Sequence, residues 1–179
     1  MEPLDLATWP PAPIKTERLV LRESEARDRT TFIDLLASPE VNEYLGGPRP
    51  RTELERELPT IPERWPGSFV VELDGAMIGH ILLRRATTHR RPAATGKADL
   101  GYLFLPHTWG AGYATEACTA ALTWFDQTLP GEPIILTTQS ANTPSIRLAT
   151  HLGFTELERF EAWNTEQWLG LRPPAEQRR

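Results

Sequence analysis

The clearest chemical signal in the sequence is a glycine turn between a strand pattern and a helix pattern. It reads Trp109-Gly-Ala-Gly-Tyr-Ala-Thr-Glu116 and follows the apolar segment Leu100-Gly-Tyr-Leu-Phe-Leu-Pro106. In such a turn, successive backbone N–H groups converge with the positive end of the helix, which binds phosphate without a basic side chain. The alternative is a tight loop that needs Gly110 and Gly112 for its geometry alone. The stretch lacks the Gly-Lys-Ser/Thr of a P-loop and the third glycine of the dinucleotide fingerprint.

Titratable side chains supply the other candidates for chemistry. Asp99 is an acid in an otherwise apolar strand pattern. If it faces a cleft, its pKa should be raised and it should accept a proton near neutrality; the alternative is a strand-start aspartate that faces solvent. His80 is expected to be a hydrogen-bonded structural residue, and His107 and His151 to lie on the surface. The histidines show no metal-ligand spacing, so the sequence predicts no metal.

Alternating and apolar runs predict the strands that position these residues. Asp74-Gly75 is the pair best suited to a type I′ turn and joins two such runs as a hairpin. Apolar side chains that recur at helical spacing predict a helix over about 112–128, with Cys118 facing the core. The predicted strands are Arg18–Arg22, Ser68–Leu73, Ala76–Leu83, Lys97–Leu105, Ile134–Gln139, Phe154–Trp163 and Glu166–Leu171.

Capping signals predict the remaining helices. Residues 25–36 carry apolar side chains at helical spacing, and Ser38-Pro39 is predicted to open a short helical stretch to Leu45. Thr52 with Glu55 forms a capping-box pattern for a helix that reaches residue 58. Thr143 is the predicted N-cap of a helix over 144–152, which Gly153 ends.

Composition limits the class of protein. A chain of 179 residues fits one domain, and a single cysteine excludes an intramolecular disulfide framework and a cysteine-based zinc site. No window resembles a membrane span or a signal peptide, so we expect a cytoplasmic protein. The net charge of −5 gives no general reason to expect nucleic-acid binding. The short basic run around 84–91 is expected to be a solvated loop, with a polyanion site as the alternative.

Four motifs in order give the chain its resemblance to a known family. They are Thr16-Glu-Arg-Leu-Val-Leu-Arg22, Leu100-Gly-Tyr, Trp109-Gly-Ala-Gly-Tyr-Ala-Thr-Glu-Ala117, and Asn142-x-x-Ser145-x-Arg147 ending in Leu152-Gly-Phe154. The sequence resembles the GNAT superfamily of N-acetyltransferases, in the subgroup of ribosomal-protein N-terminal acetyltransferases. The resemblance implies an α+β, three-layer fold whose mixed, mainly antiparallel sheet of about six to seven strands is flanked by helices. The domains expected are a lead-in over 1–14, an acetyltransferase domain over 15–172 and a polar tail over 173–179.

The resemblance also implies how acetyl-CoA is bound. The family's fourth and fifth strands, here Lys97–Leu105 and Ile134–Gln139, splay apart to admit it. The pantetheine arm is expected along the fourth strand as an added strand, and the pyrophosphate on the amides of the glycine turn. Trp109 stands where the superfamily usually has Gln or Arg, which weakens one side-chain contact. The residues expected to bind the cosubstrate are Leu103, Phe104, Leu105, Trp109, Gly110, Ala111, Gly112, Tyr113, Ala114, Thr115, Asn142 and Ser145.

Two residues are expected to be catalytic. Ser145 matches a family serine near the CoA sulfur, and its alternative role is an ordinary hydroxyl in the first turn of a helix. Asp99 lies where related enzymes place a glutamate base, and is one methylene shorter; His80 or His107 are the alternatives. Cys118 is an unfavourable nucleophile because a core position disfavours its thiolate, which argues for direct attack by the amine.

The resulting prediction is an N-acetyltransferase that moves the acetyl group of acetyl-CoA directly to a primary amine, with a protein N-terminal α-amine as first choice. Acetylation of a small-molecule amine such as an antibiotic, amino acid or polyamine is the alternative, and a non-catalytic acyl-CoA sensor is a third reading. No nucleic-acid or membrane partner is expected. The sequence leaves the monomer or homodimer state open.

Overall fold

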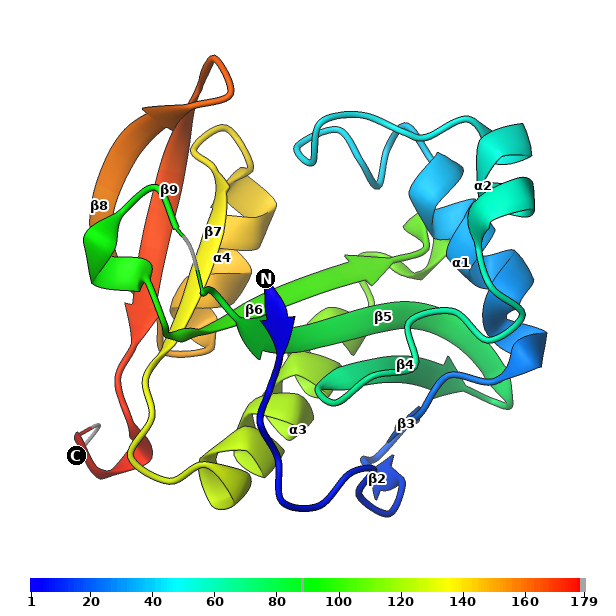
Figure 1. Cartoon of the computed structure of the whole chain (residues 1–179), viewed down its shortest axis with the longest axis horizontal. Coiled ribbons are helices and arrows are strands. Elements are labelled where there is room, and N and C mark those ends of the chain that lie inside the picture. Colours follow the sequence, from blue (N-terminus) through cyan, green and yellow to red (C-terminus); the bar gives the residue numbers. More distant parts are fainter. Residues whose placement is uncertain (88, 178–179) are drawn as a thin grey trace.

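The computed structural model describes residues 1–87 and 89–177, and the strands of this part form one nine-stranded sheet (Figure 1). The order is β2-β3-β4-β5-β6-β7-β9-β8, with β1 paired to β5. Two strands beyond the six to seven expected are two-residue segments, which are too short for a sequence pattern. The strands are β1 (Glu2–Pro3), β2 (Ile14–Lys15), β3 (Leu19–Arg22), β4 (Ser68–Leu73), β5 (Ala76–Arg85), β6 (Ala98–Phe104), β7 (Ile134–Gln139), β8 (Thr155–Ala162) and β9 (Thr165–Arg172).

The helices cover both faces of this sheet, as the predicted three-layer fold requires. Helix α3 (Tyr113–Thr128) packs on one face together with α4 (Thr143–His151). Helix α1 (Arg29–Ala37) packs on the opposite face, where Phe32 and Leu35 contact Val70 and Met77, and α2 (Arg51–Glu57) lies against α1. The fold is the mixed, mainly antiparallel architecture predicted from the sequence.

One break in the sheet creates the site. Every other strand pair is antiparallel, whereas β6 and β7 are parallel. They are paired only at Ala98 with Ile134 and at Asp99 with Ile135. β6 continues to Phe104 without a partner on that side, so the two strands diverge and leave an open edge. This is the splay that the family resemblance implies.

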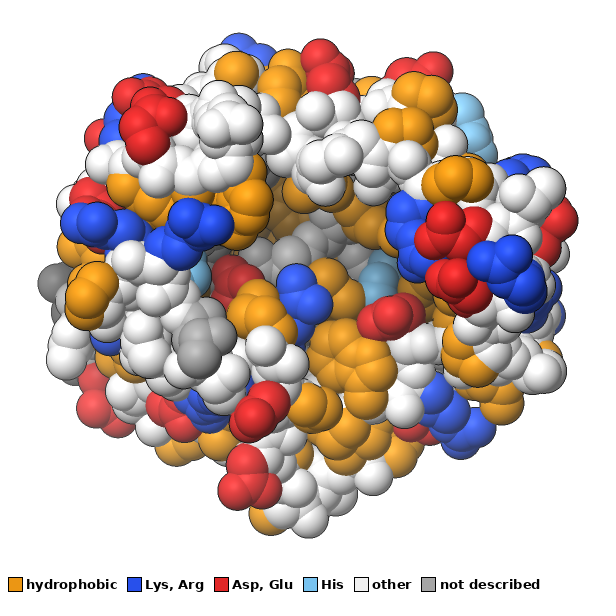
Figure 2. Space-filling view, turned by 45° about the horizontal axis from the view of Figure 1, so that its top comes forward, with side chains coloured by type: hydrophobic (Ala, Val, Ile, Leu, Met, Phe, Trp, Pro, Cys, Tyr) orange, Lys and Arg blue, Asp and Glu red, His pale blue; other side chains and the backbone are white. Residues whose placement is uncertain are grey.

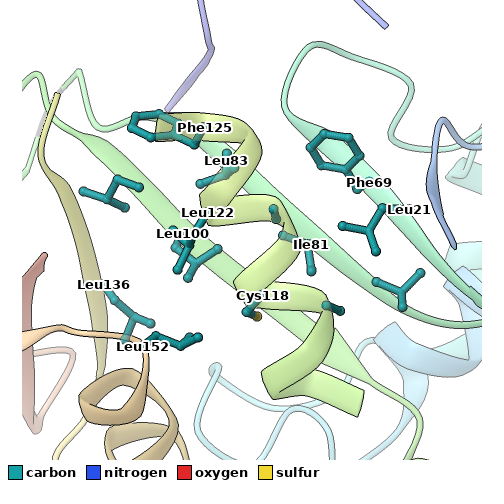
Figure 3. Close-up of a cluster of buried hydrophobic side chains, with 14 of the residues drawn as sticks. Leu21, Phe69, Ile81, Leu83, Leu100, Cys118, Leu122, Phe125, Leu136 and Leu152 are labelled. Atoms are coloured by element: carbon teal, nitrogen blue, oxygen red, sulfur yellow. The ribbon is translucent and has the colours of Figure 1, made fainter. Parts of the chain in front are cut away.

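The main core fixes α3 under the splayed strands. Its predicted stripe is buried, and Cys118, Leu122 and Phe125 point at the sheet among residues such as Ile81 and Leu100 (Figure 3). Each large apolar side chain buried in this way stabilises the fold by about 1.5–3 kcal/mol. The start of α3 is therefore held in place relative to β6.

Three local predictions were wrong. The segment 38–45 forms turns instead of a helix, because the Asn42 side chain donates to the carbonyls of Leu35 and Ser38 at the end of α1 and closes that helix. Helix α2 begins at Arg51 after Pro50, so the expected Thr52 cap lies inside the helix. The N-cap of α4 is Asn142 and not Thr143, because the Asn142 side chain accepts the Ser145 N–H.

The N-terminal segment lies against the domain. β1 pairs with the end of β5, Leu4 is 2% exposed, and the Trp9 ring contacts Phe69 and Trp124 edge-on. Residues 173–177 follow β9, with a short 3-10 turn at Ala175–Gln177. Thr88 of the predicted basic loop and the last two residues of the predicted tail lie outside the described residues. Among the described residues no helix is long and apolar enough to cross a membrane.

Candidate active site

A cavity of about 560 Å³ lies where β6 and β7 diverge. The open edge of β6, the loop into α3, the first turn of α4 and the turns after α1 form its walls. Figure 2 shows the molecule hollowed between its two halves, with hydrophobic and charged side chains around the hollow. The residues that line the cavity are Glu40, Val41, Glu43, Tyr44, Leu45, Leu100, Gly101, Tyr102, Leu103, Phe104, Thr108, Trp109, Gly110, Gly112, Tyr113, Ala114, Thr115, Leu136, Thr137, Thr138, Asn142, Pro144, Ser145 and Leu148.

The loop into α3 presents unpaired backbone donors to this cavity. Gly110 and Gly112 have φ angles of +80° and +83°, a conformation that favours glycine. α3 has no side-chain cap, and its first hydrogen bond runs from the Glu116 N–H to the Gly112 carbonyl. In the described structure the N–H groups from Gly110 to Thr115 have no partner. Together with the helix dipole they form a site for an anion such as a diphosphate.

Arg18 braces this loop from the edge of β3. Its guanidinium donates to the Ala111 carbonyl at 2.9 Å and to the Glu116 carboxylate at 2.8 Å, and it lies 4.4 Å from the centre of the Tyr113 ring. Glu116 also accepts the hydroxyl of Thr16 at 2.6 Å. Because the Ala111 carbonyl points to Arg18, the Gly112 N–H of the same trans peptide points away from Arg18.

The open edge of β6 presents a second set of backbone groups. The Leu105 N–H donates to the Ile78 carbonyl at 2.9 Å, so odd-numbered residues of β6 direct their backbone groups to β5. The backbone N–H and C=O groups of Tyr102 and Phe104 therefore point the other way, to the open edge and the cavity. The Phe104 carbonyl accepts the Trp109 indole N–H at 2.9 Å. An extended ligand that adds to this edge meets Tyr102 and Phe104, whereas Leu105, which we expected to contact it, is bonded to β5.

Ser145 lies in the first turn of α4, with its hydroxyl 2.6 Å from the hydroxyl of Tyr102. Asn142 orients this turn: its side-chain oxygen accepts the Ser145 N–H at 3.3 Å, and its amide nitrogen donates to Thr138 at 3.0 Å. Both ends of the Asn142 amide are thus used within the protein. The turn also directs the positive end of the α4 dipole into the cavity.

Asp99 lies outside the lining of the cavity, at the closed end of the β6–β7 pair. Burial raises the pKa of Asp99 to about 7, although the nearby positive charge of Arg84 lowers it. The direction agrees with the expectation for an acid in an apolar strand. Asp99 precedes Tyr102 by three positions, or about 10 Å of strand, so its carboxyl is remote from the Tyr102 hydroxyl.

The comparison with known proteins decides the family. A sequence profile described as an acetyltransferase (GNAT) domain matches residues 18–155. The chain belongs to the GNAT acetyltransferase family. The uncharacterized protein YkkB of Bacillus subtilis (strain 168) is 29% identical to this GNAT chain over 154 residues, 83% of this chain and 88% of YkkB. The uncharacterized N-acetyltransferase p20 of Bacillus licheniformis is 26% identical over 147 residues, 78% of this chain and 80% of p20.

Solved structures confirm the GNAT fold. A GNAT-family acetyltransferase from Bacillus anthracis has a TM-score of 0.71 at 23% identity, with 90% of this chain and 98% of that chain covered. The aminoglycoside acetyltransferase AAC(6')-Ib in complex with coenzyme A has a TM-score of 0.67 at 15% identity, with 87% and 94% covered. RimL, a ribosomal L7/L12 α-N-protein acetyltransferase, has a TM-score of 0.65 at 13% identity, with 90% and 94% covered. These likenesses concern the fold alone, so the ribosomal-protein subgroup stays a prediction.

This GNAT acetyltransferase is an acyltransferase that depends on acetyl-CoA. The free N–H groups of the α3 loop, the open β6 edge and the Ser145 hydroxyl belong to one cavity. No group of three or more His, Cys, Asp or Glu side chains is placed to hold a metal ion in residues 1–87 and 89–177.

The four histidines and Cys118 lie outside the lining of the cavity, although the His89 ring nitrogen is 3.3 Å from the hydroxyl of Thr137, which lines it. His80 is 3% exposed, its ring nitrogen lies 2.7 Å from the Ser68 hydroxyl, and burial lowers its pKa to about 3, with Arg84 acting in the same direction. It is the structural histidine that the sequence favours. His107 and His151 are exposed, as expected. Cys118 is buried in the core, and burial raises the pKa of its thiol, which opposes a nucleophilic role.

The basic loop after β5 is largely neutralised. Arg85 is paired with Glu132, and Arg91 donates to Glu158 at 2.6 Å. Arg90 lies 4.8 Å from the centre of the Trp163 ring. The two ion pairs agree with the expected solvated loop and neutralise two of its four arginines.

The sequence did not predict which residues the motif side chains contact. The Leu100-Gly-Tyr motif contains Tyr102, and two other motifs contain Arg18 and Glu116, but their roles arise from contacts between segments far apart in the chain. Membership of a motif was the only signal in the sequence that marked these three residues.

Proposed function

We propose that this protein transfers the acetyl group of acetyl-CoA directly to a primary amine, most favourably a protein N-terminal α-amine. The observation that carries the proposal is the convergence of the unpaired N–H groups of residues 110–115 and the Ser145 hydroxyl on one cavity. The α3 amides hold the diphosphate, the edge at Tyr102 and Phe104 pairs with the pantetheine arm, and Ser145 lies at the thioester.

Direct transfer requires a neutral amine and a stabilised leaving group. The amine nitrogen forms a bond to the acetyl carbon, the carbon–sulfur bond breaks, and its electron pair stays on sulfur. Ser145 donates a hydrogen bond to that sulfur, and the dipole of α4 favours the negative charge. The proton lost by the amine passes through water to Asp99. Cys118 takes no part, because its buried thiol resists ionisation.

The basicity of Asp99 favours an α-amine over a lysine. With a pKa of about 7, Asp99 is a weak base. Taking a proton from an α-ammonium group of pKa about 8 is uphill by about 1.4 kcal/mol. Taking it from a lysine of pKa about 10.4 is uphill by roughly 4.6 kcal/mol. The hollow between the two halves of the molecule in Figure 2 is open at the surface, as the end of a polypeptide chain requires.

One observation favours a small-molecule amine as second candidate. Glu40 and Glu43 line the cavity from the turns after α1. Two carboxylates at the mouth of the site attract acceptors that carry several positive charges. AAC(6')-Ib, which shares the fold, is an aminoglycoside acetyltransferase.

A screen of acceptors tests the proposal. Release of CoA is measured with acetyl-CoA and three acceptors: a peptide with a free N-terminus, the same peptide with a blocked N-terminus and a free lysine, and a polyamine. We expect release with the free N-terminus, none with the blocked peptide, and a mass increase of one acetyl group on the α-amine. Release with the polyamine alone supports the second candidate. Calorimetric binding of acetyl-CoA with no release for any amine makes the protein a sensor and the proposal wrong.

A further inference from the structure

We propose that Tyr102 is a positioning residue. Its phenolic hydroxyl donates a hydrogen bond to the Ser145 oxygen, and this leaves the serine hydroxyl to donate a hydrogen bond to the departing sulfur. The inference rests on the proposed function, since it assigns the sulfur to the cavity beside Ser145. It goes further in naming the group that prepares the serine for its task.

The contact joins the two sides of the splay. Tyr102 belongs to β6, at a position where β7 has already diverged, and Ser145 belongs to the first turn of α4. Their hydroxyl oxygens are 2.6 Å apart, a short hydrogen bond for two hydroxyl groups. Both residues line the cavity. The hydrogen bond therefore lies within the space assigned to the reacting thioester.

Each hydroxyl has one hydrogen, so the direction of donation decides what Ser145 can do. Neither hydroxyl has another hydrogen-bond partner in residues 1–87 and 89–177. If Ser145 donates to Tyr102, its hydrogen is used within the protein. If Tyr102 donates, the serine oxygen is the acceptor and the serine hydrogen is free for a third group. Negative charge that develops on sulfur selects this second arrangement.

The surroundings of Tyr102 keep its hydrogen in place. Burial raises the pKa of the phenol well above its usual value, although the bond to Ser145 acts in the opposite direction. The phenol therefore stays protonated and does not act as an acid. The ring packs against the main core, with its centre 6.4 Å from that of Phe104. A donor held in this way needs no reorganisation during the reaction.

The step balances without a charged tyrosine. The amine nitrogen forms a bond to the acetyl carbon, and the carbon–sulfur electron pair stays on sulfur. Ser145 keeps its hydrogen and donates a hydrogen bond to that sulfur, while Tyr102 donates a hydrogen bond to the Ser145 oxygen. CoA leaves as a thiolate, which is a fair leaving group because thiols ionise near pH ~8.5. It takes its proton from water after release. No phenolate and no alkoxide forms.

A double-mutant cycle tests the assignment in the full-length protein. Tyr102→Phe removes the hydroxyl and keeps the ring, so we expect a fall in the free energy of unfolding of no more than about 0.5–1.5 kcal/mol, the value of one hydrogen bond, and an unchanged calorimetric affinity for acetyl-CoA. The loss of one neutral hydrogen bond should lower kcat by about three- to tenfold. If Tyr102 acts through Ser145, the double variant Tyr102→Phe/Ser145→Ala should have the kcat of Ser145→Ala alone.

A change of leaving group separates positioning from packing. Acetyl thioesters of more acidic thiols need less help at sulfur, so the effect of Tyr102→Phe should shrink with them. Independent effects of the two substitutions in the double variant, or a wild-type kcat in Tyr102→Phe, overturn the assignment. A lower KM for acetyl-CoA at unchanged kcat also overturns it, because the Tyr102–Ser145 contact would then only hinder the entry of acetyl-CoA. If the wild-type protein releases no CoA with any amine, the proposed function itself is wrong. An active wild type with an unaffected Tyr102→Phe variant refutes only the role of Tyr102.

Discussion

Asp99 gives a prediction that links the stability of the fold to the chemistry of the site. Its pKa rises from 3.8 to about 7 in the folded protein. A carboxyl group whose pKa is raised by folding stabilises the folded state below its unfolded pKa, and that contribution is lost as the pH rises to the folded pKa. Wild-type stability should therefore fall between about pH 4 and pH 7 and should not fall further, through this group, above pH 7.

The substitution Asp99→Asn removes the carboxylate charge and nearly preserves the shape of the side chain. Each pH unit within the window changes the free energy of unfolding by about 1.4 kcal/mol. Between pH 5 and pH 8 the gain of the variant over wild type should grow by up to about 3 kcal/mol. The value is an upper limit because Asp99 is partly exposed, and water lowers the cost of its charge.

Urea unfolding at pH 5, 6, 7 and 8 measures this gain. Asp74→Asn, in the exposed turn between β4 and β5, is the matched control for the exchange of one aspartate for asparagine. The kinetic profile supplies an independent check, because Asp99 must be ionised to accept a proton. Wild-type kcat/KM should rise with pH through about 7 and again with the ionisation of the amine, whereas Asp99→Asn should retain only the second rise. A stability difference that does not change between pH 5 and pH 8 refutes the reasoning about burial; a retained first rise assigns the base elsewhere.

Three further substitutions test the other parts of the site. Ser145→Ala should lower kcat by at least about tenfold, whereas Thr150→Ala, on the exposed side of the same helix, should not; equal rates for wild type and Ser145→Ala remove the serine from the mechanism. Gly112→Ala places a side chain at φ +83° and 3.4 Å from the Arg18 guanidinium, so we expect about tenfold weaker acetyl-CoA binding by calorimetry. Gly131→Ala has the same φ away from the site and should bind normally. Leu122→Ala should lower the free energy of unfolding by about 2–5 kcal/mol in urea, and a loss below about 1 kcal/mol contradicts its place in the core.

The sequence predicts the parts of this fold that depend on neighbours along the chain. The Asp74-Gly75 turn has positive φ at both residues, as its pair of residue types requires. The helix over 113–128 follows its apolar stripe, and β7 spans the predicted residues 134–139. These elements follow from side-chain period and turn chemistry, which a short window of sequence contains.

Contacts across the chain decide the features that the sequence did not predict. Thr143 and Asn142 are both good N-cap residues, and the contact between Asn142 and Thr138 of β7 selects the second. The segment after α1 turns because Asn42 reaches the carbonyls at the end of that helix. Neither choice is visible until the helix and its neighbours are in place.

The difference between local patterns and long-range contacts also explains why the sequence of the glycine turn does not decide between a ligand site and a simple loop. A Gly-x-Gly turn is compatible with a simple loop, and its free N–H groups are local. The direction of these groups depends on a residue far away in the sequence. Arg18 donates hydrogen bonds to the Ala111 carbonyl and to the Glu116 carboxylate, and so fixes the orientation of the turn. The Gly112 N–H is thereby directed away from Arg18, and the Tyr102–Ser145 contact lies in the cavity that this loop lines. The proposed diphosphate site and the proposed role of Ser145, placed on one cavity, together suit an acyl-CoA, and neither feature alone would distinguish such a ligand from a simple anion.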